Sequence, residues 1–299
     1  MQIKRTLINA IKRTPFYKPL RIIYIIFRNI FFWNGWIRNY IIFPLKAFLR
    51  VHKIPIFYKD FRKIEFFKNK YNGKRCFIIA TGPSLRIADV EKLQNEITFS
   101  VNSFFRIYDK TDFRSTYYVT MDPDAERAFR NEGNYDPSKY AKEQSFLNMQ
   151  SMRKLKYKNT TYLPVCYQNH FYRLYDDGFD YGKNCRYTKD ILWGIYDKYT
   201  ITNAVIDIAI YMGFKEIFLL GVDCNYTGKL LHFIGDKNDK NFIGTDYGSK
   251  INAAMIAGYR FMERETKKRG IHIWNATRGG MLEEFDRIDF DTIDFIKSH

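Results

Sequence analysis

A short apolar strand that runs straight into a glycine turn constrains the fold of this chain more than any other feature. Residues 76–80 (CFIIA) have the apolar, β-rich composition of a strand that is buried on both faces. The turn at residues 81–84 (TGPS) ends this strand, and Ser84 is expected to cap a helix over residues 85–93. Residues 97–101 (ITFSV) form the next strand. The order strand, turn, helix, strand predicts an α/β sheet.

Candidate ligand-binding residues follow these two strands. Gly82 lies in the turn after the first strand, and Asn102 follows the second. A turn that leads into a helix presents backbone N–H groups and the positive end of the helix dipole, which both favour phosphate. Ligands of open α/β sheets bind beyond the carboxyl ends of the strands. We therefore expect both residues in one crevice, although an ordinary turn between a strand and a helix has the same local pattern.

The rest of the chain continues the alternation of strands and helices. Residues 202–212 predict an apolar helix capped by Thr202 or Asn203, and residues 215–223 predict a buried strand that ends at Asp223. The other expected elements are strands at residues 117–120, 161–165 and 271–275 and a helix at residues 250–269. Together they predict a single doubly wound, Rossmann-like, mostly parallel sheet.

The composition divides the chain into two parts. Residues 1–72 are expected to form a basic, aromatic, helical segment, and residues 73–299 the α/β domain. Within that domain, residues 125–190 are polar and aromatic with little periodicity. A connection of this length is uncommon inside a compact core, so we expect a lid-like insertion there.

Nearly all of the excess positive charge lies in the N-terminal part. The chain has a formal net charge of +17, and residues 1–75 hold ten Lys and eight Arg against Asp60 and Glu65. A transmembrane helix needs about 20 mostly apolar residues, and polar residues such as Arg28 and Arg38 interrupt the candidate windows. A secretory signal is not expected either, because no unbroken apolar core precedes a small-residue cleavage site.

Residues 1–50 have the pattern of a segment that lies on an anionic membrane. Trp33, Trp36 and Tyr40 suit the headgroup layer, and the interleaved cations suit acidic lipids. The alternative is a face that packs on the core or in a homo-oligomer. Large Ile and Phe blocks disfavour nucleic acid, which needs exposed rings for base stacking. We expect a cytoplasmic protein that is peripheral on the inner face of the cell membrane.

Metal-binding patterns are weak in this sequence. The four cysteines are scattered without a CxxC pair, which favours buried free thiols in a reducing cytoplasm. The five histidines have no metal-ligand spacing with them. Asp122 and Asp124 follow an expected strand, a spacing that resembles the metal clamp of sugar-nucleotide transferases. Asp122 before a proline is equally a common turn residue.

Four segments together resemble bacterial sialyltransferases of glycosyltransferase family 42 and the related MptE-like (DUF115) and flagellar accessory proteins. Residues 82–85 (GPSL) are similar to the glycine loop of these proteins, and residues 101–105 (VNSFF) to their Cys-Asn-Gln-Phe strand end. Residues 201–223 are similar to an Ile-Thr-Ser-Gly helix followed by a strand that ends in Gly-Ile-Asp. Residues 232–235 (HFIG) are similar to a His-Tyr-Ile-Gly run in the next loop.

This resemblance implies a GT-A-variant fold and transfer of a sialic acid-like or Kdo-like nonulosonic acid from a CMP-sugar to a surface glycan or glycolipid. The reaction inverts the anomeric centre and needs no metal or other cofactor. The expected donor-binding residues are Thr81, Gly82, Pro83, Ser84, Asn102, Asp122, Thr202, Asn203, Gly221 and Asp223. A loop histidine deprotonates the acceptor, and imidazole suits this role because its ordinary pKa lies near neutrality. Tyr226 and Tyr247 are the candidates to stabilise the departing phosphate.

Departures from the family pattern leave alternatives open. Ala80 and Thr81 replace Gly-Asn before the shared glycine, and Asn203 replaces the serine. The family base follows the glycine of the His-x-Ile-Gly run, so the base is His232 or Asp236, and we favour His232. The departures bring the sequence nearer to the MptE-like side, whose archaeal members are pterin pyrophosphokinases that use ATP and Mg²⁺. The alternatives are thus a Mg-dependent pyrophosphokinase, with Asp122, Asp124 and Asp223 at the metal and diphosphate, and a non-enzymatic membrane-associated adaptor.

Overall fold

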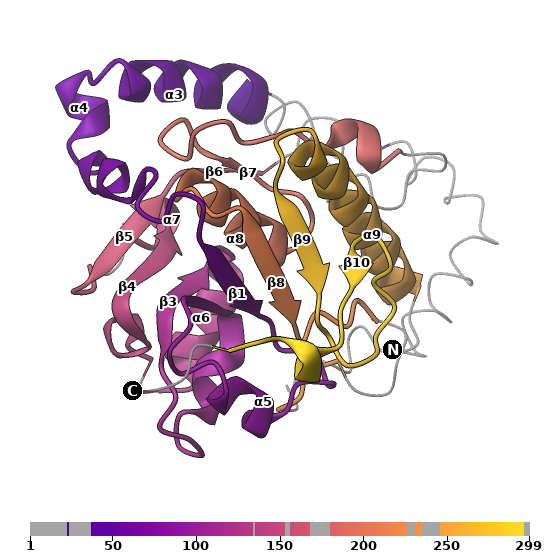
Figure 1. Ribbon diagram of the computed structural model, residues 1–299. Coiled ribbons are helices and arrows are strands. Elements are labelled where there is room, and N and C mark those ends of the chain that lie inside the picture. Colours follow the sequence, from indigo (N-terminus) through magenta and orange to yellow (C-terminus); the bar gives the residue numbers. More distant parts are fainter. Residues whose placement is uncertain are drawn as a thin grey trace.

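Eight parallel strands form the central sheet of the protein (Figure 1). The structure is a computed structural model that describes residue 23 and residues 37–133, 135–152, 156–167, 180–225, 231–234 and 246–295. Every ladder between neighbouring strands of this sheet is parallel. The strands, in spatial order, are β10 (Asp286–Arg287), β9 (His272–Asn275), β8 (Glu216–Leu220), β1 (Arg75–Ile79), β2 (Thr98–Val101), β3 (Ser115–Thr120), β4 (Ala141–Asn148) and β5 (Thr160–Leu163).

The strand order reverses between β1 and β8. From β1 the chain proceeds through β2, β3 and β4 to β5 at one edge, and β8 then pairs with the other side of β1. This order confirms the expected doubly wound α/β fold. At such a switch point the connections leave in opposite directions, which opens a crevice beyond the carboxyl ends of the two strands.

Alternate residues of β1 pack against opposite faces of the sheet. Cys76 and Ile78 belong to the larger apolar cluster, together with residues of α8 (Ile201–Tyr211) and α9 (Asp246–Lys267). Phe77 and Ile79 belong to a second cluster, which contains Val90 of α5 (Ile87–Glu91) and Phe290. Because both faces are covered, the strand is apolar from Cys76 to Ile79 instead of alternating with polar residues.

Short elements complete the domain. A two-stranded parallel sheet pairs β6 (Val165–Cys166) with β7 (Ile195–Tyr196). The connecting helices are η3 (Asn102–Ile107), α6 (Pro123–Asn131), η4 (Pro137–Lys139), α7 (Met149–Met152), η6 (Gly182–Asn184) and η8 (Phe290–Thr292).

The described part of the basic N-terminal segment packs on this domain. It forms η1 (Arg38–Ile42), α3 (Phe43–Val51), α4 (Pro55–Tyr58) and η2 (Arg62–Phe67). The buried guanidinium of Arg50 donates hydrogen bonds to the backbone carbonyls of Leu192 and Trp193. Ile64 and Phe67 lie in the larger apolar cluster. The inner side of this segment therefore packs on the domain.

The expected lid-like insertion at residues 125–190 is wrong for a large part of that range. Residues 141–148 and 160–163 form β4 and β5, which extend the central sheet. The sequence concealed β4 because its first residues are exposed and only residues 145–148 are buried, so its apolar pattern is short. Residues 168–179 of the same range lie outside the described residues.

Two further expectations concern the cysteines and the membrane. All four cysteines are free and buried, as expected from their scattered positions. Among the described residues, no helix has both the length and the apolar character needed to cross a membrane.

Arg50 is predicted to anchor α3. Replacement of Arg50 by Ala leaves two buried carbonyl groups without their donor, so the free energy of unfolding should fall by about 2–4 kcal/mol. The matched control is Lys46→Ala, on the exposed side of the same helix, which should change stability by less than about 0.5 kcal/mol. Urea unfolding measures both variants, and an equal effect of the two would contradict the anchoring role.

Candidate functional site

The switch point holds a pocket that is open to solvent. Its walls come from the segments after β1, β2 and β8, from the start of α8 and from α9. Seven of the expected site residues meet there: Thr81, Gly82, Asn102, Thr202, Gly221, Asp223 and His232. The sequence therefore located the pocket, although not every residue in it.

Gly82 permits the backbones that follow β1 and β8 to approach closely. Its N–H donates to the carbonyl of Gly221 at 2.8 Å. A Cβ atom at Gly82 would lie 1.9 Å from Oδ2 of Asp223 and 2.5 Å from the Gly221 carbonyl oxygen. Gly221 has φ +67, a left-handed conformation that glycine adopts without strain. Both glycines are thus required by the geometry of the turn.

Ser84 binds Asp223 instead of capping a helix. Its hydroxyl donates to Oδ2 of Asp223 at 2.8 Å, and its backbone N–H lies 3.4 Å from the same oxygen. The expectation of a helix capped by Ser84 is wrong, because α5 begins at Ile87 after Arg86, which makes no side-chain cap. Burial raises the pKa of Asp223, and the hydrogen bonds from Ser84 oppose that rise. The carboxylate is therefore oriented but poorly solvated.

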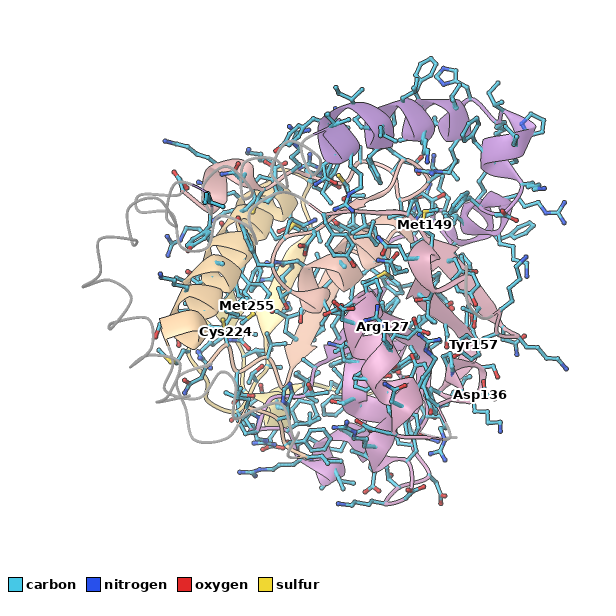
Figure 2. All side chains as sticks on the ribbon, turned by 180° about the vertical axis from the view of Figure 1, so that it is seen from behind. Arg127, Asp136, Met149, Tyr157, Cys224 and Met255 are labelled. Atoms are coloured by element: carbon cyan, nitrogen blue, oxygen red, sulfur yellow. The ribbon has the colours of Figure 1, made fainter. Side chains whose placement is uncertain are left out.

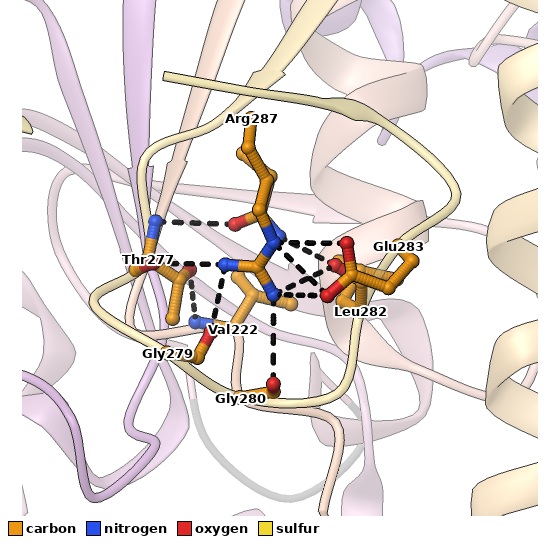
Figure 3. A network of polar contacts seen from close by, with 8 residues as sticks. Val222, Thr277, Gly279, Gly280, Leu282, Glu283 and Arg287 are labelled. Carbon is orange, nitrogen blue, oxygen red and sulfur yellow. Dashed lines mark hydrogen bonds and ion pairs between the residues drawn. The ribbon is translucent and has the colours of Figure 1, made fainter. Parts of the chain in front are cut away.

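A loop after β9 fixes the backbone at Asp223. The N–H of Met281 donates to the Asp223 carbonyl at 2.7 Å, and the N–H of Val222 donates to the Thr277 hydroxyl at 3.0 Å. The guanidinium of Arg287 lies within the curve of this loop (Figure 3): it donates to the carbonyl of Gly279 at 3.0 Å and forms an ion pair with Glu283, among other contacts. The network thus braces the end of β8 from outside the pocket.

Asn102 stands at the end of β2 in a strained conformation. Its φ is +47, which asparagine tolerates better than most residues. Its side-chain oxygen accepts a hydrogen bond from Thr120 at 3.2 Å, and its backbone carbonyl accepts one from Tyr118 at 2.7 Å. With the oxygen engaged, the amide NH₂ is the group that Asn102 offers to a ligand in the pocket.

The amino end of α8 points its first backbone N–H groups at the pocket. Thr200 is the N-cap, and its hydroxyl accepts from the N–H of Thr202 at 3.3 Å. The expectation that Thr202 or Asn203 caps the helix is wrong by two or three residues. Thr200, Ile201 and Thr202 line the pocket. Because α8 is eleven residues long, its amino end carries a partial positive charge, which favours an anion over a cation beside it.

Asn203 supports this helix start from behind. It is fully buried and does not line the pocket. Its amide donates to the carbonyl of Lys198 at 3.0 Å. Lys198 forms a buried ion pair with Asp207 on the next turn of α8. A Cβ atom at Gly258 of α9 would lie 2.5 Å from the Lys198 carbonyl oxygen, so α9 also closes on this loop. Asn203 thus positions the loop that leads into α8 and does not contact the pocket.

His232 lies beside the glycine turn. The N–H of the next residue, Phe233, donates to the carbonyl of Thr81 at 2.9 Å. The ring of Phe233 lies 6.4 Å from that of Phe104, which attaches the loop to the second apolar cluster. His232 is half-buried and lines the pocket. Tyr226 and Asp236 lie outside the described residues, as does the side chain of Tyr247, whose backbone belongs to α9.

The two aspartates after β3 do not join this pocket. The carboxylate of Asp122 caps α6 by accepting the N–H of Asp124 at 2.8 Å, and Asp124 forms an ion pair with Arg127 at 3.0 Å. Neither lines the pocket, so the turn interpretation of Asp122 holds and the clamp with Asp223 does not form. Among the described residues, no group of three or more His, Cys, Asp or Glu side chains is placed to hold a metal.

Sequence reasoning missed the wall contributed by α9. Met255 and Tyr259 line the pocket with Cys224, and Figure 2 shows Met255 next to Cys224, away from Asp136 and Tyr157. The Tyr259 hydroxyl lies 3.4 Å from that of Thr200. The spacing of apolar residues along α9 indicated that one face of the helix is buried, but it did not indicate that this face lines the pocket. Thr200 could have been predicted as the N-cap, because it is a hydroxyl residue directly before an apolar helical run.

The sequence matches a known family over more than half of its length. The family model described as 6-hydroxymethylpterin diphosphokinase MptE-like matches residues 51–229. No curated protein matches the sequence.

Two solved structures are similar to the chain. The Maf glycosyltransferase from Magnetospirillum magneticum AMB-1 has 13% sequence identity and a TM-score of 0.46, with 76% of this chain and 36% of that chain covered. The sialyltransferase CstII from Campylobacter jejuni, in complex with the substrate analogue cytidine-5'-monophosphate, has 17% identity and a TM-score of 0.44, with 75% of this chain and 89% of that chain covered. The chain thus spans little more than a third of the length of the Maf protein.

Ser84 is predicted to stabilise the ionised form of Asp223. A folded-state pKa raised by burial means that the contribution of Asp223 to stability is greatest at low pH and is lost as the pH rises through that pKa. Ser84→Ala removes the opposing hydrogen bond, so it should cost about 1–2 kcal/mol more at pH 7 than at pH 4. Urea unfolding at both values measures this. In an Asp223→Asn background, the pH dependence of the Ser84→Ala effect should vanish, and its persistence there would contradict the assignment.

Proposed function

The protein belongs to the 6-hydroxymethylpterin diphosphokinase MptE-like family, and we propose that it is an inverting glycosyltransferase that uses a CMP-sugar. The observation that carries this proposal is the pocket at the switch point, where, among the described residues, a helix amino end and neutral donors accompany one carboxylate, that of Asp223. Such a set suits one phosphate group attached to a nucleoside. The sugar is a nonulosonic acid, and the acceptor is a surface glycan or a glycolipid.

The donor phosphate is assigned to the start of α8. The N–H of Ile201, with the helix dipole behind it, neutralises part of the charge on a phosphodiester. The Asn102 amide donates from the other side of the pocket. Asp223 accepts hydrogen bonds only, so it suits a hydroxyl or amino group of the donor and repels its phosphate.

The acceptor is assigned to the side of His232. The acceptor hydroxyl attacks the anomeric carbon while the bond from that carbon to the phosphate oxygen breaks and CMP leaves. His232 takes the hydroxyl proton as general base. One displacement inverts the anomeric centre. Tyr226 and Tyr247 remain the candidates to donate to the departing phosphate, and Asp236 is the alternative base.

A Mg-dependent pyrophosphokinase is the second candidate, and the family match favours it. Transfer of a diphosphate through Mg²⁺ requires oxygen ligands, commonly one or two carboxylates beside the phosphates. In the described part of the pocket, Asp223 is the one carboxylate, and Asp122 and Asp124 are engaged at α6. These residues fit a metal-diphosphate site poorly, so we prefer the hypothesis of a CMP-sugar donor.

Asn102→Asp tests the donor site. Aspartate has the same shape and tolerates the left-handed conformation of Asn102, but it replaces an amide donor by a negative charge. The affinity for CMP, measured by calorimetry, should fall at least about tenfold. Asn131→Asp at the exposed end of α6 adds the same charge and should bind CMP as the unmodified protein does. Equal affinity of both variants would contradict the assignment.

His232→Ala tests the catalytic base. Turnover, measured as CMP release from a CMP-nonulosonic acid in the presence of acceptor, should fall by about 100-fold or more. Affinity for CMP should change little, because the imidazole acts on the acceptor. The matched control is His272→Ala on β9, which does not line the pocket and should keep full turnover. A fully active His232→Ala protein would transfer the role to Asp236.

A further inference from the structure

The outward face of the N-terminal helices is apolar. Along η1 and α3, Ile37, Ile41, Leu45 and Phe48 follow one another at helical spacing and are 39%, 50%, 58% and 50% exposed. Ile56 of α4 is 75% exposed. We call these five residues the α3 face. Scattered exposed apolar residues are ordinary, but a run of large ones along one helix marks an interaction surface.

The α3 face is exposed although α3 itself is packed on the domain through its opposite side. Ala47 is fully buried, and Arg50, which is 4% exposed, binds the carbonyls of Leu192 and Trp193. The helix is therefore held in one orientation, with its inner side on the domain and the α3 face turned outward. Figure 1 shows α3 at the outer boundary of the molecule.

Cations surround the α3 face. Arg38 and Lys46 on η1 and α3 are exposed, and so are Lys53 and Lys59 before and after α4. Lys53 is paired with Glu65 at 3.1 Å, and Asp60 is the other acidic residue of the first 75 residues. An apolar strip bordered by positive charge matches the interface of a bilayer that contains anionic lipids.

We propose that the α3 face seats the protein on an anionic lipid bilayer. The apolar side chains enter the boundary between headgroups and acyl chains, and the flanking cations contact the acidic headgroups. A second copy of this chain is the less favourable occupant. In a twofold contact through the same face, the cations of both copies would meet without acidic partners to balance them.

Docking in this way also orients the pocket. Figure 1 shows α3 beyond the amino ends of the central strands, whereas the pocket lies at their carboxyl ends. The pocket therefore faces away from the bilayer. If the proposed function is taken as the basis, this orientation favours an acceptor sugar at the end of a glycan chain that extends away from the lipid surface. The docking itself requires no catalytic activity.

The test is co-sedimentation of the full-length protein with vesicles. The probes are vesicles of phosphatidylcholine mixed with phosphatidylglycerol and vesicles of phosphatidylcholine alone. The variant carries Leu45→Gln and Phe48→Gln, which removes apolar surface without a change of charge. Its control is Met281→Gln, an exposed apolar residue (48%) beyond the carboxyl end of β9. Urea unfolding verifies that all three proteins are equally stable.

The expected result is binding of the unmodified protein and of Met281→Gln to the mixed vesicles, at least about tenfold stronger than binding of the double variant. Binding to phosphatidylcholine alone should be weak. Equal binding of all three proteins, or no binding of the unmodified protein, would overturn the proposal. A third result would also overturn it: neither the unmodified protein nor the double variant binds vesicles, and sedimentation velocity shows a dimer for the unmodified protein and a monomer for the double variant. The α3 face would then be the contact with a second copy.

Discussion

The contact between Gly82 and the segment after β8 is the constraint on which the rest of the site depends. The N–H of Gly82 donates to the Gly221 carbonyl, and the absence of a side chain leaves room for the Asp223 carboxylate. That approach brings Ser84 within hydrogen-bonding distance of Asp223. Any larger residue at position 82 would displace Asp223 or open the turn, since protein interiors have little free volume. The carboxylate, the turn and the pocket wall are therefore one unit.

The electrostatic character of the pocket follows from a second set of contacts. The buried pair of Lys198 and Asp207 and the amide of Asn203 hold the loop that ends at Thr200. Thr200 then fixes the point at which α8 begins and where its positive end is directed. The amino end of α8 and the Asp223 carboxylate thus line one pocket, and separate sets of contacts hold each of them. This separation suits a nucleotide whose phosphate and nucleoside parts need opposite partners.

The sequence predicted the centre of the sheet better than its margins. The strands predicted at residues 76–80 and 215–223 correspond to β1 and β8, because residues 76–79 and 217–220 are apolar and both faces of these strands are covered. The strand β4 was missed because only its second half is buried. The helix N-caps were misplaced because several hydroxyl residues could have served as the cap. The partnership of Ser84 with Asp223 links positions 139 residues apart, and no local pattern encodes such a contact. The contribution of Met255 and Tyr259 to the pocket could not be predicted either, because it also depends on contacts between residues far apart in the sequence.

The most direct test of the central claim is calorimetric titration of the unmodified protein with CMP and with ATP, each in EDTA and in Mg²⁺. CMP should bind with the same affinity in both conditions, because the proposed site holds its phosphate with a helix amino end and an amide. ATP should bind weakly whether or not Mg²⁺ is present. Binding of ATP that requires Mg²⁺, with no binding of CMP, would contradict the account and establish the pyrophosphokinase alternative.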